Sequence, residues 1–150
     1  MSFWNKLKAN AASLQKGLAD EVTKFKNDAF MHAVTAGCAM MASADGEISS
    51  SEKQKMIGFI QNSDALKVFD LQKVIASFNA IVAKFDFDRT IGEGEALALV
   101  SKIKGKPEAR IVVAVVLAVA NADGNFDPKE REVARKIAAA AAVDPAEFNI

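Results

Sequence analysis

The sequence predicts an all-α fold in a single domain. Glycine and proline are scarce, at eight and three of 150 residues, and the strict alternation of apolar and polar residues typical of strands is hard to find. Apolar residues recur instead at steps of three and four. With 51% hydrophobic residues the chain can fill one core, but it is short for two independent domains. We therefore assign residues 1–150 to one domain of about seven helices.

The first three helices follow from their apolar patterns and their end signals. Residues 1–27 form an N-terminal amphipathic segment, with an apolar stripe opposite a lysine-rich face. The second predicted helix, 28–44, is apolar almost all round, as a central helix would be. Gly46 suits the left-handed residue that ends a helix, and Ser49 with Glu52 three positions later indicates a capping box that opens a third helix towards residue 61.

The middle of the chain predicts two more helices. Residues 66–85 carry apolar side chains at helical steps, with Asp70 as the candidate N-cap. Residues 86–92 are predicted to be a connector, and the glycine-rich stretch Gly92 to Glu95 is interpreted as a loop that enters the next helix. A fifth helix over about 93–104 should stop at Gly105 and the proline that follows.

The last two helices have the clearest signals. The longest apolar stretch, Ile111 to Ala120, lies in a predicted sixth helix over about 108–122. It covers only about half of the roughly 20 residues that a membrane-spanning helix needs, so we interpret it as a buried core helix. Asp127 followed by Pro128 is the strongest helix-start signal in the chain, and it opens a seventh helix that ends near residue 143.

A short acidic segment that connects two helices, here called a joint, occurs twice in the sequence. The octapeptide DGEISSSE of Asp45–Glu52 returns as DGNFDPKE at Asp123–Glu130, 78 residues later (123 − 45). A small-residue apolar helix precedes each copy. The chain therefore contains two helix–joint–helix units, about 29–61 and 108–143, for which we predict a pseudo-two-fold relation.

Composition excludes several classes of function. Nineteen basic residues balance nineteen acidic ones, so no overall field recruits nucleic acid. The single Cys38 cannot form an intramolecular disulfide and no signal-peptide pattern is present, which favours the cytoplasm. Cys38 sits in an apolar run and is predicted to be a core residue rather than a reactive thiol. His32 is the only histidine and is predicted to be structural.

Ordinary helix termination and capping explain part of each joint. The glycines end one helix, and Ser49 and Asp127 cap the next by accepting a backbone N–H. Glu52 and Glu130 close the boxes and lie at the positive end of the helix dipole. Termination and capping do not account for the acidic and amide residues around the glycines. These unexplained residues are Asp45, Glu47, Asp123 and Asn125.

The alternative is a cation site. The joints match the latter part of an EF-hand calcium loop, but its opening ligands are replaced by helical positions such as Met41 and Val119, so neither copy forms a complete EF-hand. Two joints facing each other would pool enough oxygen ligands for a divalent cation, with calcium the favoured ion. The candidate metal ligands are Asp45, Glu47, Glu52, Asp123, Asn125, Asp127 and Glu130.

The N-terminal helix leaves two interpretations open. Its lysines, with Phe3 and Trp4 on the opposite face, suit peripheral contact with a membrane surface or a partner helix. Its heptad-like apolar stripe suits packing on the core. We favour core packing for most of this helix.

The duplicated joint, with a small-residue apolar helix before each copy, and the opening MSFWNKLK resemble the TerB family of tellurite-resistance proteins along the whole chain. The resemblance implies an all-helical cytoplasmic protein of a bacterial tellurium-resistance and stress-response system. It also implies association with other tellurite-resistance proteins, including an integral-membrane partner and a calcium-binding one, at the inner face of the inner membrane. In that family the acidic joint residues are proposed to bind metal. Ser49 departs from Asp127 at the equivalent position, so the first copy offers one ligand fewer.

The leading hypothesis is a non-enzymatic adaptor whose paired joints bind a divalent cation. The alternative is a purely structural interaction module whose joints are helix caps without metal. An enzyme is the least favoured reading, because one cysteine and one histidine offer neither a redox pair nor a nucleophile–base couple.

Overall fold

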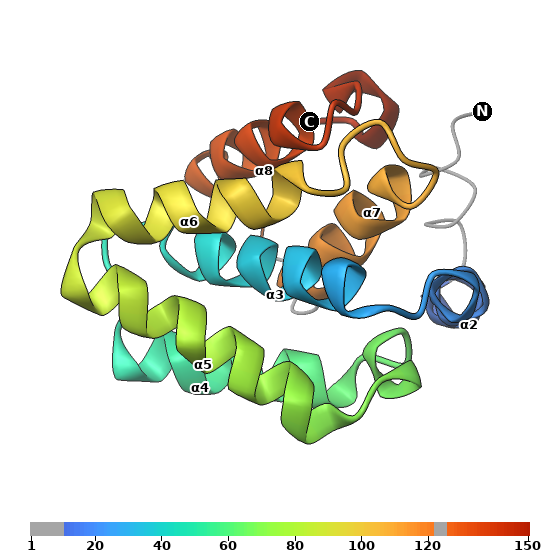
Figure 1. Ribbon diagram of the computed structural model, residues 1–150, viewed down its shortest axis with the longest axis horizontal. Coiled ribbons are helices and arrows are strands. Elements are labelled where there is room, and N and C mark those ends of the chain that lie inside the picture. The colour runs from blue at the N-terminus through green and yellow to red at the C-terminus, as the bar shows by residue number, and fades with distance from the viewer. Residues whose placement is uncertain (1–10, 122–125) are drawn as a thin grey trace.

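The computed structural model describes residues 11–121 and 126–150. These residues form seven α-helices and two short 3-10 helices and contain no strand, which confirms the all-α prediction (Figure 1). In chain order the elements are α2 (Ala11–Lys24), α3 (Asp28–Ala42), α4 (Ser50–Asn62), η1 (Leu66–Val68), α5 (Leu71–Phe87), α6 (Arg89–Ser101), α7 (Ala109–Ala120), α8 (Pro128–Ala140) and η2 (Pro145–Phe148).

Side-chain caps set the starts of most of these helices. Ser49, Asp70 and Asp127 are the N-caps of α4, α5 and α8, as the sequence predicts. Each accepts a hydrogen bond from a backbone N–H of the first turn, which would otherwise have no partner within the helix. Asn27 does the same for α3, where its side chain accepts from the N–H of Phe30 over 2.9 Å.

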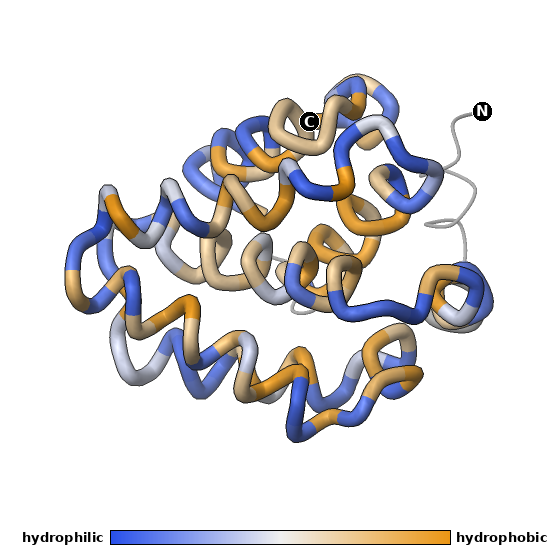
Figure 2. The backbone as a smooth tube through the Cα atoms, viewed as in Figure 1, coloured by the Kyte–Doolittle hydropathy of each residue, from blue (hydrophilic) through white to orange (hydrophobic). Residues whose placement is uncertain are grey.

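Two apolar helices form the centre of the molecule. α3 contacts α4, α5, α6, α7 and α8, and α7 is buried along almost its whole length, as expected for a core helix. In Figure 1, α4 and α5 lie on one side of α3 and α6 and α8 on the other. α7 is drawn mostly in orange in Figure 2, whereas blue and orange alternate along the outer helices α5 and α8. The polar faces of the outer helices therefore meet solvent.

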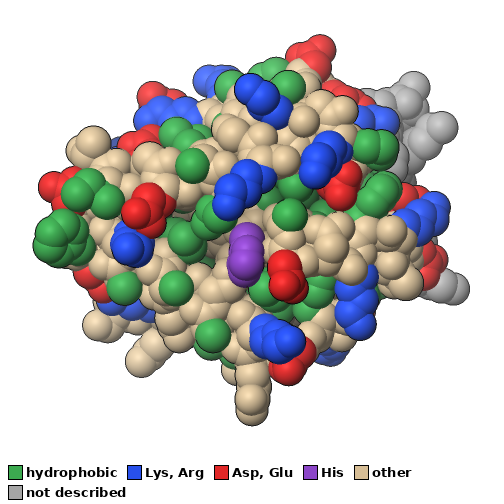
Figure 3. All heavy atoms as spheres, in the orientation of Figure 1, with side chains coloured by type: hydrophobic (Ala, Val, Ile, Leu, Met, Phe, Trp, Pro, Cys, Tyr) green, Lys and Arg blue, Asp and Glu red, His purple; other side chains and the backbone are tan. Residues whose placement is uncertain are grey.

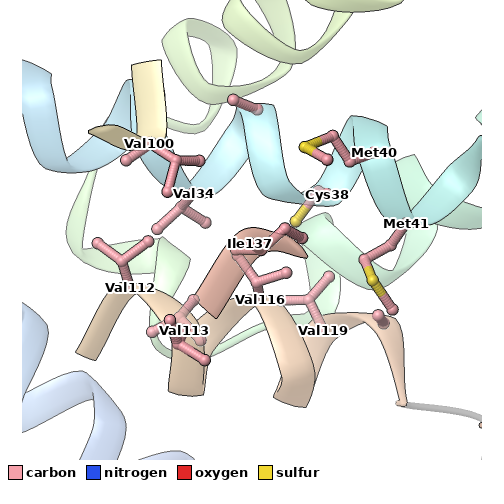
Figure 4. Packing of buried hydrophobic residues seen from close by; sticks show 14 of the residues in the cluster. Val34, Cys38, Met40, Met41, Val100, Val112, Val113, Val116, Val119 and Ile137 are labelled. Carbon is pink, nitrogen blue, oxygen red and sulfur yellow. The ribbon is translucent and has the colours of Figure 1, made fainter. Parts of the chain in front are cut away.

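The contact between α3 and α7 joins equivalent positions of the two repeat units. Figure 4 shows Val34, Cys38 and Met41 on the side of α3 that faces Val112, Val116 and Val119 of α7. Each pair is 78 positions apart, the spacing of the repeated joints. The pseudo-two-fold relation of the whole units stays a prediction.

The predicted connector over residues 86–92 is wrong. α5 continues to Phe87, and Asp88 alone separates it from α6, ending one helix and capping the next with its side chain. Gly92 lies inside α6 and is buried against Phe85 of α5. Its missing side chain permits the two helices to approach closely, which is why a glycine stands within a helix here.

Other ends differ by a few residues. The predicted fifth helix (93–104) begins earlier and ends at Ser101, with Gly105 at the expected left-handed φ of 75°. The C-terminal tail forms η2 and buries Phe148. Of the predicted N-terminal segment, residues 11–24 form α2, which buries Leu18 and Val22 against the core, and residues 1–10 lie outside the described part. No helix among the described residues is long and apolar enough to cross a membrane.

Candidate functional site between the two acidic joints

The first joint turns the chain sharply after α3. The N–H of Ser43 donates to the carbonyls of Ala39 and Met40, and the N–H of Gly46 donates to the Ser43 carbonyl over 2.9 Å. Gly46 has a φ of 111°, a backbone conformation that a side chain would strain. Ile48 is buried and fixes the far end of the turn to the core. The turn leaves Asp45 and Glu47 exposed.

The cap of α4 differs from the predicted capping box in its second bond. Ser49 Oγ accepts from the backbone N–H of Glu52 over 3.1 Å, which is the expected cap. The Glu52 carboxylate accepts a hydrogen bond from the Ser49 hydroxyl over 3.2 Å, rather than from the Ser49 backbone N–H that a capping box would use. The two side chains are therefore coupled directly, and Glu52 is held at the start of α4.

The described part of the second joint forms the complete capping box that the sequence predicts. Asp127 Oδ1 accepts from the Glu130 N–H over 2.8 Å, and Glu130 Oε1 accepts from the Asp127 N–H over 3.4 Å. Pro128 occupies the first turn, where its missing N–H costs nothing. Phe126 packs against the core, with the Arg131 guanidinium 5.9 Å from its ring centroid.

The two joints line one pocket of about 470 Å³, here called the inter-joint pocket. The first joint contributes Asp45 and Glu52, and the second contributes Asp127 and Glu130. Four of the seven candidate ligands, from positions far apart in the sequence, therefore face a common space. Its full lining is Met41, Ala42, Ala44, Asp45, Glu52, Lys55, Met56, Phe59, Ala120, Phe126, Asp127 and Glu130.

The other three candidate ligands are not among the described lining residues. Glu47 is exposed and is not part of the pocket lining. Asp123 and Asn125 lie outside the described residues. Across residues 11–121 and 126–150, no three acidic, histidine or cysteine side chains are arranged to hold a metal ion. The set of seven metal ligands stays a prediction. Four of its members, all among the described residues, line the same cavity.

Sequence reasoning missed the residues of α4 that complete the pocket. Lys55, Met56 and Phe59 follow Glu52 at helical spacing, so one face of α4 lines the cavity. Lys55 Nζ lies 5.7 Å from the centroid of the Phe59 ring, within the range of a cation–π contact. The spacing was visible in the sequence, but nothing local indicated which face of α4 would meet the second joint.

Cys38 and His32 are the two residues that could suggest catalysis. Cys38 is fully buried, and this burial raises the pKa of its thiol to about 12, which keeps the sulfur protonated and unreactive at neutral pH. This confirms its predicted place in the core. His32, purple in Figure 3, lies half-buried on a face where basic and acidic side chains are interspersed. Across the described residues, neither forms a nucleophile–base pair.

Two comparisons with known proteins agree on the family. The family model described as tellurite resistance protein TerB matches residues 31–150, a range that includes both joints. A protein of Alcaligenes sp. named tellurium resistance protein TerB is 46% identical over 109 residues, which cover 73% of this chain and 89% of the relative. No solved structure matches the chain.

Proposed function

The chain belongs to the TerB family of tellurite-resistance proteins, which relates its function to tellurite resistance, and from this premise we propose that it is a non-enzymatic helical adaptor that binds a divalent cation. The cation is held by the paired acidic joints, and calcium is the favoured ion. The adaptor contacts other tellurite-resistance proteins in the cytoplasm, including an integral-membrane partner at the inner face of the inner membrane.

The observation that carries the proposal is the shared pocket. Asp45 and Glu52 from one joint line the same cavity as Asp127 and Glu130 from the other. Four carboxylates around one space repel each other when ionised, and a divalent cation would relieve that repulsion. Calcium takes six to eight oxygen ligands, with ligand distances of about 2.3–2.6 Å, so neither joint alone would satisfy it.

The capping bonds are compatible with this role. Asp127 and Glu130 each use one carboxylate oxygen in the capping box, and a carboxylate has two oxygens with about four acceptor sites in all. The helix caps also hold these side chains at fixed positions at the start of α8. Capping therefore prepares the second joint for an ion rather than competing with one.

The second candidate function is an interaction module whose joints are only caps. The complete capping box at Asp127 and Glu130 favours it, because that box accounts for both side chains without a ligand. It leaves the presence of Asp45 in the pocket lining without a role.

The test is a calcium titration of the intact protein followed by ¹H–¹⁵N NMR. We expect the amides around Gly46 and Gly124 to shift and saturate, with magnesium a weaker competitor. The Asp127→Asn variant keeps a cap acceptor and loses one charge, so it should bind calcium more weakly while the fold is unchanged. Asp64→Asn, which alters an exposed carboxylate paired with Lys67 outside the pocket, is the matched control and should bind like the wild type. Unmoved amides at millimolar calcium would refute the proposal.

Partner binding separates the two candidate functions. Asp45→Asn barely alters capping, because Ser49 and not Asp45 caps α4. The caps-only alternative predicts that this variant captures the partner proteins as well as the wild type does. An adaptor that uses Asp45 for binding predicts weaker capture of the partner proteins by this variant.

A further inference from the structure

The floor of the inter-joint pocket is apolar, a property that an ion alone would not use. Met41, Ala42, Met56 and Ala120 line the pocket and are buried, whereas its four acidic residues are exposed or half-buried. Rings of Phe59 and Phe126 complete the lining. The volume of about 470 Å³ falls within the roughly 300–1,000 Å³ of pockets that hold organic ligands. Part of the lining therefore offers an apolar surface to an occupant.

The charges of the lining specify the other part of that occupant. Four carboxylates, those of Asp45, Glu52, Asp127 and Glu130, face one ammonium group, that of Lys55, among the described lining residues. An anionic or neutral apolar ligand would leave this excess of negative charge uncompensated. A ligand with an apolar stem and a cationic head meets both the floor and the rim.

Two basic side chains lie against aromatic rings of the lining, and one of them, Lys55, itself lines the pocket. The ammonium group of Lys55 is placed over the Phe59 ring, and the guanidinium of Arg131 is placed over the Phe126 ring. Long basic side chains bury their methylene stems on apolar surface and keep the charged head among polar groups. Methionine side chains adapt their shape to such stems, because they are unbranched and polarizable.

We propose that the inter-joint pocket binds a lysine or arginine side chain presented by a partner protein. The stem of that side chain lies on Met41 and Met56, and its cationic head lies among the carboxylates of the two joints. This inference rests on the adaptor part of the proposed function and names the partner chemistry of the same site. Because the head and a divalent cation use the same carboxylates, the two compete, and each lowers the affinity for the other.

The test uses n-hexylammonium as the probe and the methionine methyl groups of the full-length protein as the readout. In ¹H–¹³C spectra, the Met41 and Met56 methyls should shift saturably as the probe is added. Met31 and Met40 are internal references, because they are buried away from the pocket. Hexanoate has the same stem with the opposite charge and should cause no saturable shift.

Variants and calcium decide what an observed shift means. Asp127→Asn should weaken hexylammonium binding roughly five-fold, the effect of one solvent-screened ion pair, whereas the control Asp64→Asn should not. Calcium should lower the apparent affinity for hexylammonium in proportion to the fraction of the protein that has calcium bound. If hexylammonium leaves Met41 and Met56 unmoved, or hexanoate shifts them equally, the inference is overturned even if calcium shifts the Gly46 amide. If hexylammonium binds and calcium moves no amide, the inference stands and the divalent-cation proposal fails.

Discussion

Gly37 of α3 packs against Val116 of α7 so closely that a β-carbon at position 37 would lie 2.6 Å from Val116 Cγ2. Both residues are fully enclosed by the core. A contact of this length forces one of the two helices or the valine to move. Valine cannot rotate away readily, because its χ1 angle is restricted within a helix. The absence of a side chain at Gly37 therefore sets the distance between the central helices.

Gly37→Ala should destabilise the protein. Overpacking of a core typically costs about 1–3 kcal/mol, which exceeds the roughly 1 kcal/mol that alanine gains over glycine in a helix. We expect a net loss of up to about 2 kcal/mol in the free energy of unfolding, measured by urea denaturation.

A double-mutant cycle tests the cause. In a Val116→Ala background the obstructing methyl groups are absent, so Gly37→Ala should be neutral or stabilising there. Gly58→Ala in α4, where a β-carbon meets nothing within 4 Å, is the matched control and should stabilise by about 0.5–1 kcal/mol. An equal loss from Gly37→Ala in both backgrounds would contradict the contact.

Gly92→Ala should be more damaging than Gly37→Ala. A β-carbon at position 92 would lie 2.7 Å from the backbone N and Cα of Phe85, and a backbone cannot rotate aside. We expect a loss at or above the upper end of the roughly 1–3 kcal/mol range, measured by thermal and urea unfolding. Gly94→Ala, two residues along the same helix and in open space, should not destabilise. Similar stabilities for the two variants would refute the packing explanation.

The helix caps at the two joints should differ in their contributions. Asp127→Ala removes the acceptor of the shorter cap bond, 2.8 Å against 3.1 Å at Ser49, and should cost about 1–2 kcal/mol, while the Asp127 backbone N–H still donates to Glu130. Ser49→Ala removes the cap bond and the bond from the Ser49 hydroxyl to Glu52, and should cost about 1 kcal/mol. Asp127→Asn keeps the acceptor and should lie within about 0.5 kcal/mol of the wild type. Chemical denaturation of the three variants measures the order, and a large loss for Asp127→Asn would show that its charge, not its cap, stabilises the fold.

The buried Cys38 predicts a loss of stability at alkaline pH. Burial raises the pKa of its thiol from 9.0 to about 12, so between these values the unfolded chain releases a proton that the folded chain retains. Deprotonation therefore favours unfolding, and the free energy of unfolding should fall by up to about 1.4 kcal/mol per pH unit above pH 9, with no effect below it.

The matched control for Cys38 is Cys38→Ala. It lacks the thiol and shares every other titrating group, so its stability should fall less steeply between pH 9 and 10.5. The folded wild type should also resist a thiol reagent at pH 8 until urea unfolds it. Parallel pH profiles for the two proteins would show that the thiol does not titrate differently on folding.

The comparison of sequence and structure separates local from non-local information. Apolar periodicity and cap residues placed α3, α4, α7 and α8 within a few residues, because these signals act over one or two turns of helix. The junction at Asp88 was mispredicted because Gly92 suggested a loop. Its role is a close approach to Phe85, which no local pattern reveals.

The same division applies to the candidate site. The sequence by itself determined that an acidic joint occurs twice and that its glycines and cap residues end and begin helices. Only the tertiary structure decided that Asp45 and Glu52 share a cavity with Asp127 and Glu130, and that Lys55, Met41 and Met56 complete it. The physical reason is that α3 and α7 pack face to face through side chains 78 positions apart. That contact brings their C-terminal ends, and the joints that follow them, to one place.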